Sequence, residues 1–174
     1  EKQVGVEVRQ EGEHLELVVH GDGDLDAITA QVARVVSADA DGVAWDAICA
    51  ADPVLARVHA LAPGFRPSNF HSPYEAAVWS IISARRARPQ GIALRRKLAE
   101  AYGRSFVLAG QTESAIPTPT ELLKISSFPG LPADRIPRLH AIANAAHEGL
   151  LDIEHLRARQ PEAAMLDLQQ LPGI

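Results

Sequence analysis

Residues 70–104 contain a strong helix-start signal, within the sequence FHSPYEAAVWSIISARRARPQGIALRRKLAEAYGR. Ser72 can serve as the N-cap, Pro73 takes the first helical position, and Glu75 follows at the spacing of a capping box. Apolar residues then recur on one side of the predicted helix, at Ala77, Val78, Ile81 and Ile82. This wide apolar stripe predicts a helix that is buried along one face.

Three arginines, Arg85, Arg86 and Arg88, follow the apolar stripe directly, and we refer to them as the arginine corner. A second predicted helix follows and ends at Gly103, a residue type that is common at helix C-caps. Residues 85–104 hold seven Lys/Arg and one acid, a net charge of +6, although the whole chain carries −5. A basic patch on an otherwise acidic protein can attract a polyanion at one place. The alternative interpretation is an ordinary solvated helix face.

The cysteine content and the hydropathy restrict the cellular setting. A single cysteine, Cys49, excludes an internal disulfide and fits a reducing cytoplasm. No apolar run reaches the length that spans a bilayer. We therefore expect a cytoplasmic protein without membrane contact. The chain begins at Glu1 and stops at Leu-Pro-Gly-Ile, and we expect it to be part of a longer protein.

The first fifty residues predict a small antiparallel β/α piece. Residues 4–9 and 14–20 alternate apolar and polar side chains, which predicts a β-hairpin with its turn in Gln-Glu-Gly-Glu. Asp24 can cap a following helix. Two strands alone are marginally stable, so we expect further strands outside this sequence. We interpret residues 1–50 as the C-terminal part of a small α+β sheet domain.

The remaining residues, 51–174, predict an all-α domain of six or seven helices joined by short turns. Cap-and-proline signals recur at Asp52-Pro53 and at Thr118-Pro119, the second followed by a short predicted helix with the sequence ELLKIS. Residues 105–117 predict an extended loop or a short hairpin. The fold class is therefore α+β, and predominantly α.

Two turns share the pattern apolar-Pro-Gly-apolar. We call residues 128–131 the first Pro-Gly turn and residues 171–174 the second. Each can be an ordinary helix–helix connection. Such a turn can also point main-chain N–H groups at a phosphate, which suits sequence-independent binding to a nucleic-acid backbone. No combination of residues in this sequence forms a recognisable catalytic set or zinc site.

Leu171-Pro172-Gly173-Ile174 resembles the first half of the helix-hairpin-helix motif of the DNA glycosylase superfamily. The order of segments over residues 52–174 is similar to the alkylation-repair branch, the 3-methyladenine DNA glycosylases. The segments that carry this resemblance are SPYEAAVWSII, KLAEAYG, PTPTEL, LPADRIPRLHAIANAAHEGLLDI and LPGI. The N-terminal hairpin and helix resemble the end of that branch's sheet domain, which is similar to a TATA-binding-protein repeat.

The resemblance implies base-excision repair: a damaged, alkylated base is flipped out of the duplex and its N-glycosidic bond is hydrolysed. The catalytic aspartate of the family would lie beyond Ile174, so no residue of this chain is a catalytic candidate. The DNA-facing turn of the family usually reads Gly-Gln-Gln, whereas the matching residues here are Ser83, Ala84 and Arg85. This departure keeps a second hypothesis open, a catalytically inactive DNA-binding module of the same fold. A third is a helical domain unrelated to DNA, its arginines paired internally.

The resemblance also implies site residues and partners. The partner is double-stranded DNA, bound by a monomer. The main-chain carbonyls of three residues would ligate a monovalent cation that bridges to a DNA phosphate, with no other cofactor: Gln169, Leu171 and Ile174. The expected DNA contacts are the arginine corner and the second Pro-Gly turn: Arg85, Arg86, Arg88, Leu171, Gly173 and Ile174. We expect the arginine corner to be largely exposed and to contact phosphates without selecting a base.

Overall fold

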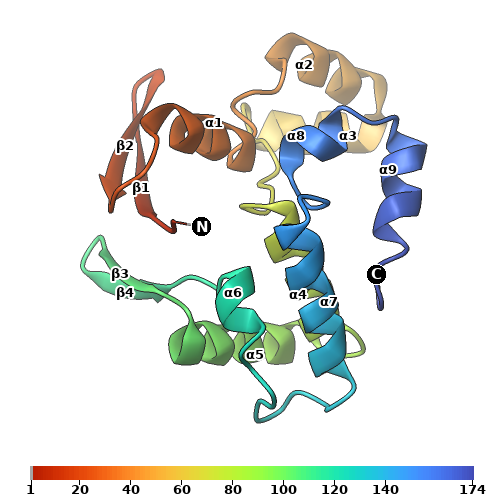
Figure 1. Cartoon of the computed structure of the whole chain (residues 1–174). Coiled ribbons are helices and arrows are strands. Elements are labelled where there is room, and N and C mark those ends of the chain that lie inside the picture. Colours follow the sequence, from red (N-terminus) through yellow and green to blue (C-terminus); the bar gives the residue numbers. More distant parts are fainter. Residues whose placement is uncertain (1) are drawn as a thin grey trace. The chain divides into compact units, whose positions relative to one another are not determined.

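The computed structural model describes residues 2–174, and its fold is α+β with helices predominating, as the sequence predicts (Figure 1). Across this range the chain forms, in order, β1 (Gly5–Glu11), β2 (His14–His20), α1 (Leu25–Val35), α2 (Gly42–Ala51), α3 (Pro53–Leu61), α4 (Pro73–Ser83), α5 (Arg88–Tyr102), β3 (Ser105–Leu108), β4 (Gln111–Ser114), α6 (Pro119–Leu122), α7 (Arg135–His147), α8 (Ile153–Arg157) and α9 (Pro161–Leu168). No helix within the described range is long and apolar enough to cross a membrane.

The described chain separates into two compact units, residues 2–23 with 72–174, and residues 24–71. These units differ from the predicted domains, residues 1–50 and 51–174. The division into a sheet domain and a helical domain stays a prediction.

The first hairpin pairs β1 with β2 in antiparallel register from Gly5 opposite His20 to Glu11 opposite His14. Its turn contains Gly12 at a φ of 61°, so the predicted turn in Gln-Glu-Gly-Glu is confirmed. Gly5 is buried, and a Cβ atom there would lie 2.8 Å from the side chain of Leu108 in β3. The absence of a side chain at Gly5 therefore lets the two hairpins approach each other.

The second hairpin, β3 with β4, follows α5, so the hairpin alternative for residues 105–117 is confirmed. Gly103 is the C-cap of α5, as predicted, but its φ is −91°, outside the left-handed region that favours glycine. Space requires the glycine instead, because a Cβ atom at Gly103 would lie 1.7 Å from the carbonyl oxygen of Ala115.

The capped helix predicted from residue 73 is α4. The Ser72 hydroxyl accepts the Glu75 N–H at 3.1 Å, and Pro73 occupies the first turn, so this helix start is confirmed. The carboxylate of Glu75 is buried and pairs with Arg95 of α5, a contact that no local pattern indicates. Arg95 therefore holds two helices together within the basic segment.

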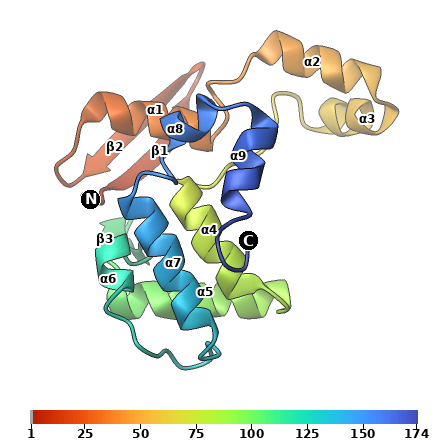
Figure 2. The same ribbon diagram turned by 45° about the vertical axis from the view of Figure 1, so that its right-hand side comes forward.

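The hydrophobic core lies where α4, α5, α6 and α7 pack on one another. Figure 2 shows α4 and α7 side by side, with α5 crossing beneath them. The predicted stripe of α4 faces this core, and Val78, Ile81 and Ile82 are each only 1% exposed. The core is mainly aliphatic, and its most buried members include Val78, Ile81, Ile82, Leu98, Leu122, Leu139 and Ile142.

The helix predicted in ELLKIS is shorter than expected, because α6 ends at Leu122. After Leu123, the N–H groups bond three residues back, Lys124 to the carbonyl of Glu121 and Ile125 to that of Leu122. These tighter bonds end the α-helical path. The bend leaves Leu122 and Ile125 both buried.

The unit of residues 24–71 consists of α1, α2 and α3. Their N-caps are Asp24, Asp41 and Asp52, and each carboxylate accepts two main-chain N–H groups. The caps predicted at Asp24 and Asp52 are confirmed. The loop after α3 is held by Arg66, which donates to the carbonyls of Ser37 and Ala40, both at 2.8 Å.

Candidate nucleic-acid interface

A strained turn ends α4. The Arg86 N–H donates to the carbonyl of Ser83 at 3.0 Å, while Ala84 has φ −53° and ψ 127° and Arg85 has a φ of 57°. This is a type II turn, whose third position favours glycine or asparagine. An arginine held there costs about 1 kcal/mol of backbone strain. The side chain of Arg85 is exposed at this turn.

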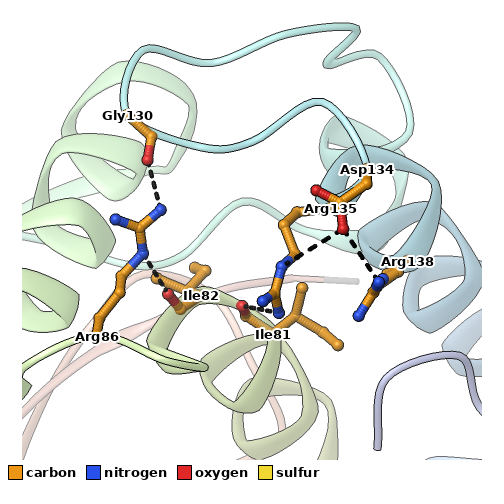
Figure 3. Close-up of polar contacts among 7 residues, drawn as sticks. All are labelled: Ile81, Ile82, Arg86, Gly130, Asp134, Arg135 and Arg138. Atoms are coloured by element: carbon orange, nitrogen blue, oxygen red, sulfur yellow. Dashed lines mark hydrogen bonds and ion pairs between the residues drawn. The ribbon is translucent and has the colours of Figure 1, made fainter.

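Arg86 does not lie free on the surface. Its Nε donates to the carbonyl of Ile82 at 3.1 Å, and its Nη2 donates to the carbonyl of Gly130 at 2.6 Å (Figure 3). The side chain is half-buried, so the prediction that the whole arginine corner is largely exposed is wrong for Arg86. The physical reason is the set of unpaired carbonyls at the end of a helix, which a nearby guanidinium satisfies. Arg86 thereby joins the end of α4 to the first Pro-Gly turn.

A second arginine satisfies the same helix end from α7. Arg135 Nη1 donates to the carbonyl of Ile81 at 3.2 Å, and its side chain is 14% exposed (Figure 3). Positive charge at a helix C-terminus also complements the helix dipole. Asp134 Oδ2 lies 3.9 Å from Arg135 Nε and accepts from Arg138 Nη2 at 3.0 Å.

The sequence analysis missed both Arg135 and Arg138. The available signal was local: Asp134 and Arg138 are four residues apart at the start of a predicted helix, a spacing that forms ion pairs. The hydrogen bond of Arg135 to α4 had no sequence signal.

The second Pro-Gly turn also lies against the end of α4. The Ile174 N–H donates to the carbonyl of Leu171 at 3.1 Å, and Gly173 has a φ of 97°. A Cβ atom at Gly173 would lie 2.9 Å from Ile81 Cδ1 and 3.1 Å from Arg138 Cδ. The fold therefore brings the arginine corner and the second Pro-Gly turn, 83 residues apart or more in the sequence, to the same helix end.

The predicted cation ligands lie at this turn. Gln169 is the exposed C-cap of α9, and the carbonyl of Leu171 already accepts one hydrogen bond. A carbonyl oxygen has a second lone pair, so that bond leaves room for a cation. Cation binding and the DNA contacts of these residues stay predictions. In residues 2–174, no group of three or more His, Cys, Asp or Glu side chains could hold a metal ion.

The other basic residues of segment 85–104 divide into paired and unpaired groups. Arg96 donates to Glu100 at 2.7 Å, and this hydrogen-bonded carboxylate raises the pKa of Arg96. Arg104 donates to the carbonyl of Gln3 at 2.9 Å and lies over the ring of Phe106. In the part of the chain that the structure describes, three exposed cations of this segment have no hydrogen-bond or ion-pair partner: Arg85, Arg88 and Lys97.

This fold is that of DNA glycosylases, and the resemblance inferred from the sequence is confirmed at the level of the fold. No protein-family model matches the chain, and no curated protein matches it. The 3-methyladenine DNA-glycosylase from Archaeoglobus fulgidus matches with a TM-score of 0.78 and 19% identity, over 98% of this chain and 60% of that one.

Two further solved structures contain DNA. The 8-oxoguanine glycosylase/lyase of Clostridium acetobutylicum, in complex with double-stranded DNA, matches with a TM-score of 0.67 and 19% identity, over 97% of this chain and 58% of that one. MBOgg1 in complex with a low affinity DNA ligand matches with a TM-score of 0.69 and 19% identity, over the same shares. The chain thus spans 58–60% of the length of these proteins.

Proposed function

We propose that the full-length protein is a DNA glycosylase of base-excision repair, which hydrolyses the N-glycosidic bond of an alkylated base flipped out of the duplex. One observation carries the proposal: a chain with the DNA glycosylase fold presents the unpaired Arg85 and Arg88 beside the end of α4, which also contacts the second Pro-Gly turn. The proposal includes double-stranded DNA as partner, a monomeric protein and a cytoplasmic location.

In this proposal the chain supplies the contacts that bind the DNA backbone. Arg85 and Arg88 contact phosphates, which fixes the position of the protein on the duplex without reading its sequence. The second Pro-Gly turn adds main-chain contacts, with a monovalent cation at the carbonyls of Gln169, Leu171 and Ile174. The free energy of these contacts offsets the cost of unstacking the base that is flipped out of the duplex.

Catalysis is assigned to a segment outside this sequence. By the resemblance, an aspartate beyond Ile174 stabilises the oxocarbenium-like charge on the sugar as the base leaves, a role that carboxylates have in glycoside hydrolysis. An alkylated base that is already cationic is a good leaving group, so little acid catalysis is required.

The second candidate is a DNA-binding module of the same fold without catalysis. It is favoured by the replacement of Gly-Gln-Gln by Ser83, Ala84 and Arg85, with Arg85 strained at a φ of 57°. In this candidate, Arg85 contacts a DNA phosphate where the family's glutamines contact DNA through their amides, and no base is excised. The two candidates differ in whether the sequence that follows Ile174 contains the aspartate.

The test uses the full-length protein with three duplexes of one sequence, containing 3-methyladenine, 8-oxoguanine or no damage. Release of the methylated base supports the glycosylase and its alkylation specificity. Release of 8-oxoguanine alone would contradict the alkylation specificity, while the proposal that the protein is a glycosylase would stand. Tight binding of all three duplexes without release favours the binding module, and absence of binding to any duplex overturns both candidates.

A further inference from the structure

The proposed function leaves the first Pro-Gly turn, residues 128–131, without a role. We infer that this turn, acting through Arg86, holds Arg85 in the backbone conformation in which it meets a DNA phosphate. Arg86 is thus a positioning residue that contacts no phosphate itself. The inference rests on the proposed function, because the contact that it prepares is the one between Arg85 and the DNA backbone.

The first argument is that Arg85 adopts a conformation which its residue type disfavours. Its φ of 57° lies in the left-handed region, which a residue with a Cβ atom enters only where its surroundings impose it. Its side chain is exposed, and none of the described residues forms a hydrogen bond or ion pair with it. The constraint on its backbone therefore comes from neighbouring residues.

The second argument is that Arg86, the next residue, is bound at three points. Its main-chain N–H donates to the carbonyl of Ser83 at 3.0 Å, which closes the turn around Arg85. Its guanidinium donates to the carbonyl of Ile82 at 3.1 Å and to that of Gly130 at 2.6 Å, 44 residues away in the chain (Figure 3). A rotation of the backbone at Arg85 would move Arg86 away from these acceptors, so the three bonds together oppose it.

The third argument is that the first Pro-Gly turn is itself fixed in place. The Leu131 N–H donates to the carbonyl of Phe128 at 3.0 Å, and Gly130 has a φ of 85°, which indicates a type II turn centred on Pro129 and Gly130. A Cβ atom at Gly130 would lie 3.4 Å from Leu94 Cδ1, so the turn lies against α5. The side chain of Leu131 is buried in the core. A carbonyl on such a turn can hold a guanidinium in one place.

Positioning by Arg86 and a phosphate contact made by Arg86 itself have different effects on DNA binding. A lost phosphate contact lowers the log–log salt slope of duplex binding by about 0.9. A lost positioning residue leaves the contacts of the complex unchanged and reduces only the fraction of the protein that is ready to bind. The apparent Kd then rises by the same factor at every salt concentration.

The experiment uses the full-length protein and the substitution Arg86→Met, which removes every donor of the side chain and keeps its length. The matched control is Arg66→Met, because Arg66 is also half-buried and donates to two main-chain carbonyls, those of Ser37 and Ala40, in the other compact unit. Melting temperatures establish that the variants are folded at the temperature of the assay. Duplex binding is then measured across a salt series for each variant, alone and combined with Arg85→Ala. If Arg86→Met does not fold, Arg86→Lys, whose ammonium can reach one of the two carbonyls, takes its place.

A second measurement reports the backbone at Arg85 without DNA. Trypsin cleaves after arginine and requires a locally unfolded segment, so the rate of cleavage after Arg85 in the native protein measures how often this turn opens. The bond after Arg88 precedes Pro89 and resists trypsin, so it does not interfere. The masses of the fragments identify the bond that is cleaved.

We expect Arg86→Met to raise the apparent Kd about fivefold at every salt concentration with an unchanged slope, because the relaxed backbone at Arg85 is then favoured. Cleavage after Arg85 should also become faster. Arg66→Met should leave the Kd, the slope and this cleavage rate unchanged. In the Arg85→Ala background, Arg86→Met should cost no further affinity, because the side chain that it positions is absent.

The outcomes separate the inference from the proposed function. A reduced slope in Arg86→Met, or an affinity loss that adds in full to that of Arg85→Ala, overturns the inference, because Arg86 would then bind DNA itself. Unchanged affinity and unchanged cleavage in Arg86→Met also overturn it. If Arg85→Ala leaves duplex binding unchanged, the proposed DNA contact of Arg85 is wrong, and the cleavage rates alone decide whether Arg86 holds the turn.

Discussion

Arg135, at the start of α7, donates a hydrogen bond to the main-chain carbonyl of Ile81, a residue 54 positions earlier in the chain. The side chain of Ile81 is 1% exposed and lies next to Gly173 of the second Pro-Gly turn. One residue of α4 therefore touches both α7 and that turn. Because the last carbonyls of a helix lack partners within the helix, this hydrogen bond fixes the helix end from which the arginine corner projects.

Replacement of Arg135 by alanine should destabilise the fold. It removes a charged donor from a buried carbonyl, a loss of about 1.5–3 kcal/mol in the free energy of unfolding. Urea unfolding of the protein measures this change. Arg159→Ala, which breaks an exposed ion pair, should cost less than about 1 kcal/mol and serves as the control. Equal losses in the two variants would contradict the capping role of Arg135.

Replacement of Arg85 by glycine should raise the stability of the fold and weaken DNA binding. Arg85→Gly relieves the positive φ and should raise the free energy of unfolding by about 1 kcal/mol, while Arg85→Ala keeps the Cβ atom and the strain. Both variants should lower the salt slope of duplex binding by about 0.9. Urea unfolding measures the change in the free energy of unfolding, and fluorescence anisotropy measures the change in the salt slope of duplex binding. A destabilised glycine variant would show that the strain is absent in solution.

Replacement of Arg86 by alanine should act mainly on stability. Its guanidinium bonds the carbonyls of Ile82 and Gly130, so its loss should cost about 1.5–3 kcal/mol of unfolding free energy. The salt slope should change less than in Arg85→Ala, because the charge of Arg86 is already engaged. A slope change equal to that of Arg85→Ala, without loss of stability, would show that Arg86 is exposed and contacts a DNA phosphate, as the sequence predicts.

Replacement of Gly103 by alanine should disrupt the junction between α5 and the second hairpin. The new Cβ atom would lie 1.7 Å from the Ala115 carbonyl, so the backbone must move, at a cost of about 3 kcal/mol. Gly149→Ala is the control, since Gly149 has a φ of 77° and open space around it. Its cost should be about 1 kcal/mol. Thermal unfolding compares them, and a smaller loss for Gly103→Ala would contradict the packing explanation.

Glu7 should make the fold sensitive to acid. The Ala109 main-chain N–H donates to its carboxylate at 2.9 Å, and this bond, with those to Arg9 and His20, holds the pKa of Glu7 below its ordinary value. A lowered folded-state pKa stabilises the protein above the unfolded-state pKa, and this stabilisation is lost as the pH falls through the folded-state value. Melting temperatures from about pH 7 to about pH 3 should therefore fall less for Glu7→Gln than for wild type. Parallel curves would contradict the role of Glu7.

Features that depend on neighbouring residues were predictable. The N-caps at Asp24, Asp52, Ser72 and Thr118 follow from side-chain oxygens that bond N–H groups two or three residues onward. Such bonds form within one turn and need no tertiary partner. The buried stripe of α4 and the first hairpin followed in the same way from periodicities of 3.6 and 2 residues. The helix starts and the buried face of α4 were therefore determined locally.

Contacts between distant segments decided what the local patterns left open. Arg85 and Arg86 are adjacent and identical in the sequence, but only Arg86 meets the carbonyl of Gly130, 44 residues away, so one arginine is exposed and the other is part of the framework. Arg138 gained its place beside Gly173 through the packing of α7 on α4. The sequence alone determined where the helices start and which faces they bury, because those interactions span a few residues. The tertiary structure decided which charges remain free for a ligand, because a guanidinium bonds whichever carbonyl or carboxylate the folded chain brings to it.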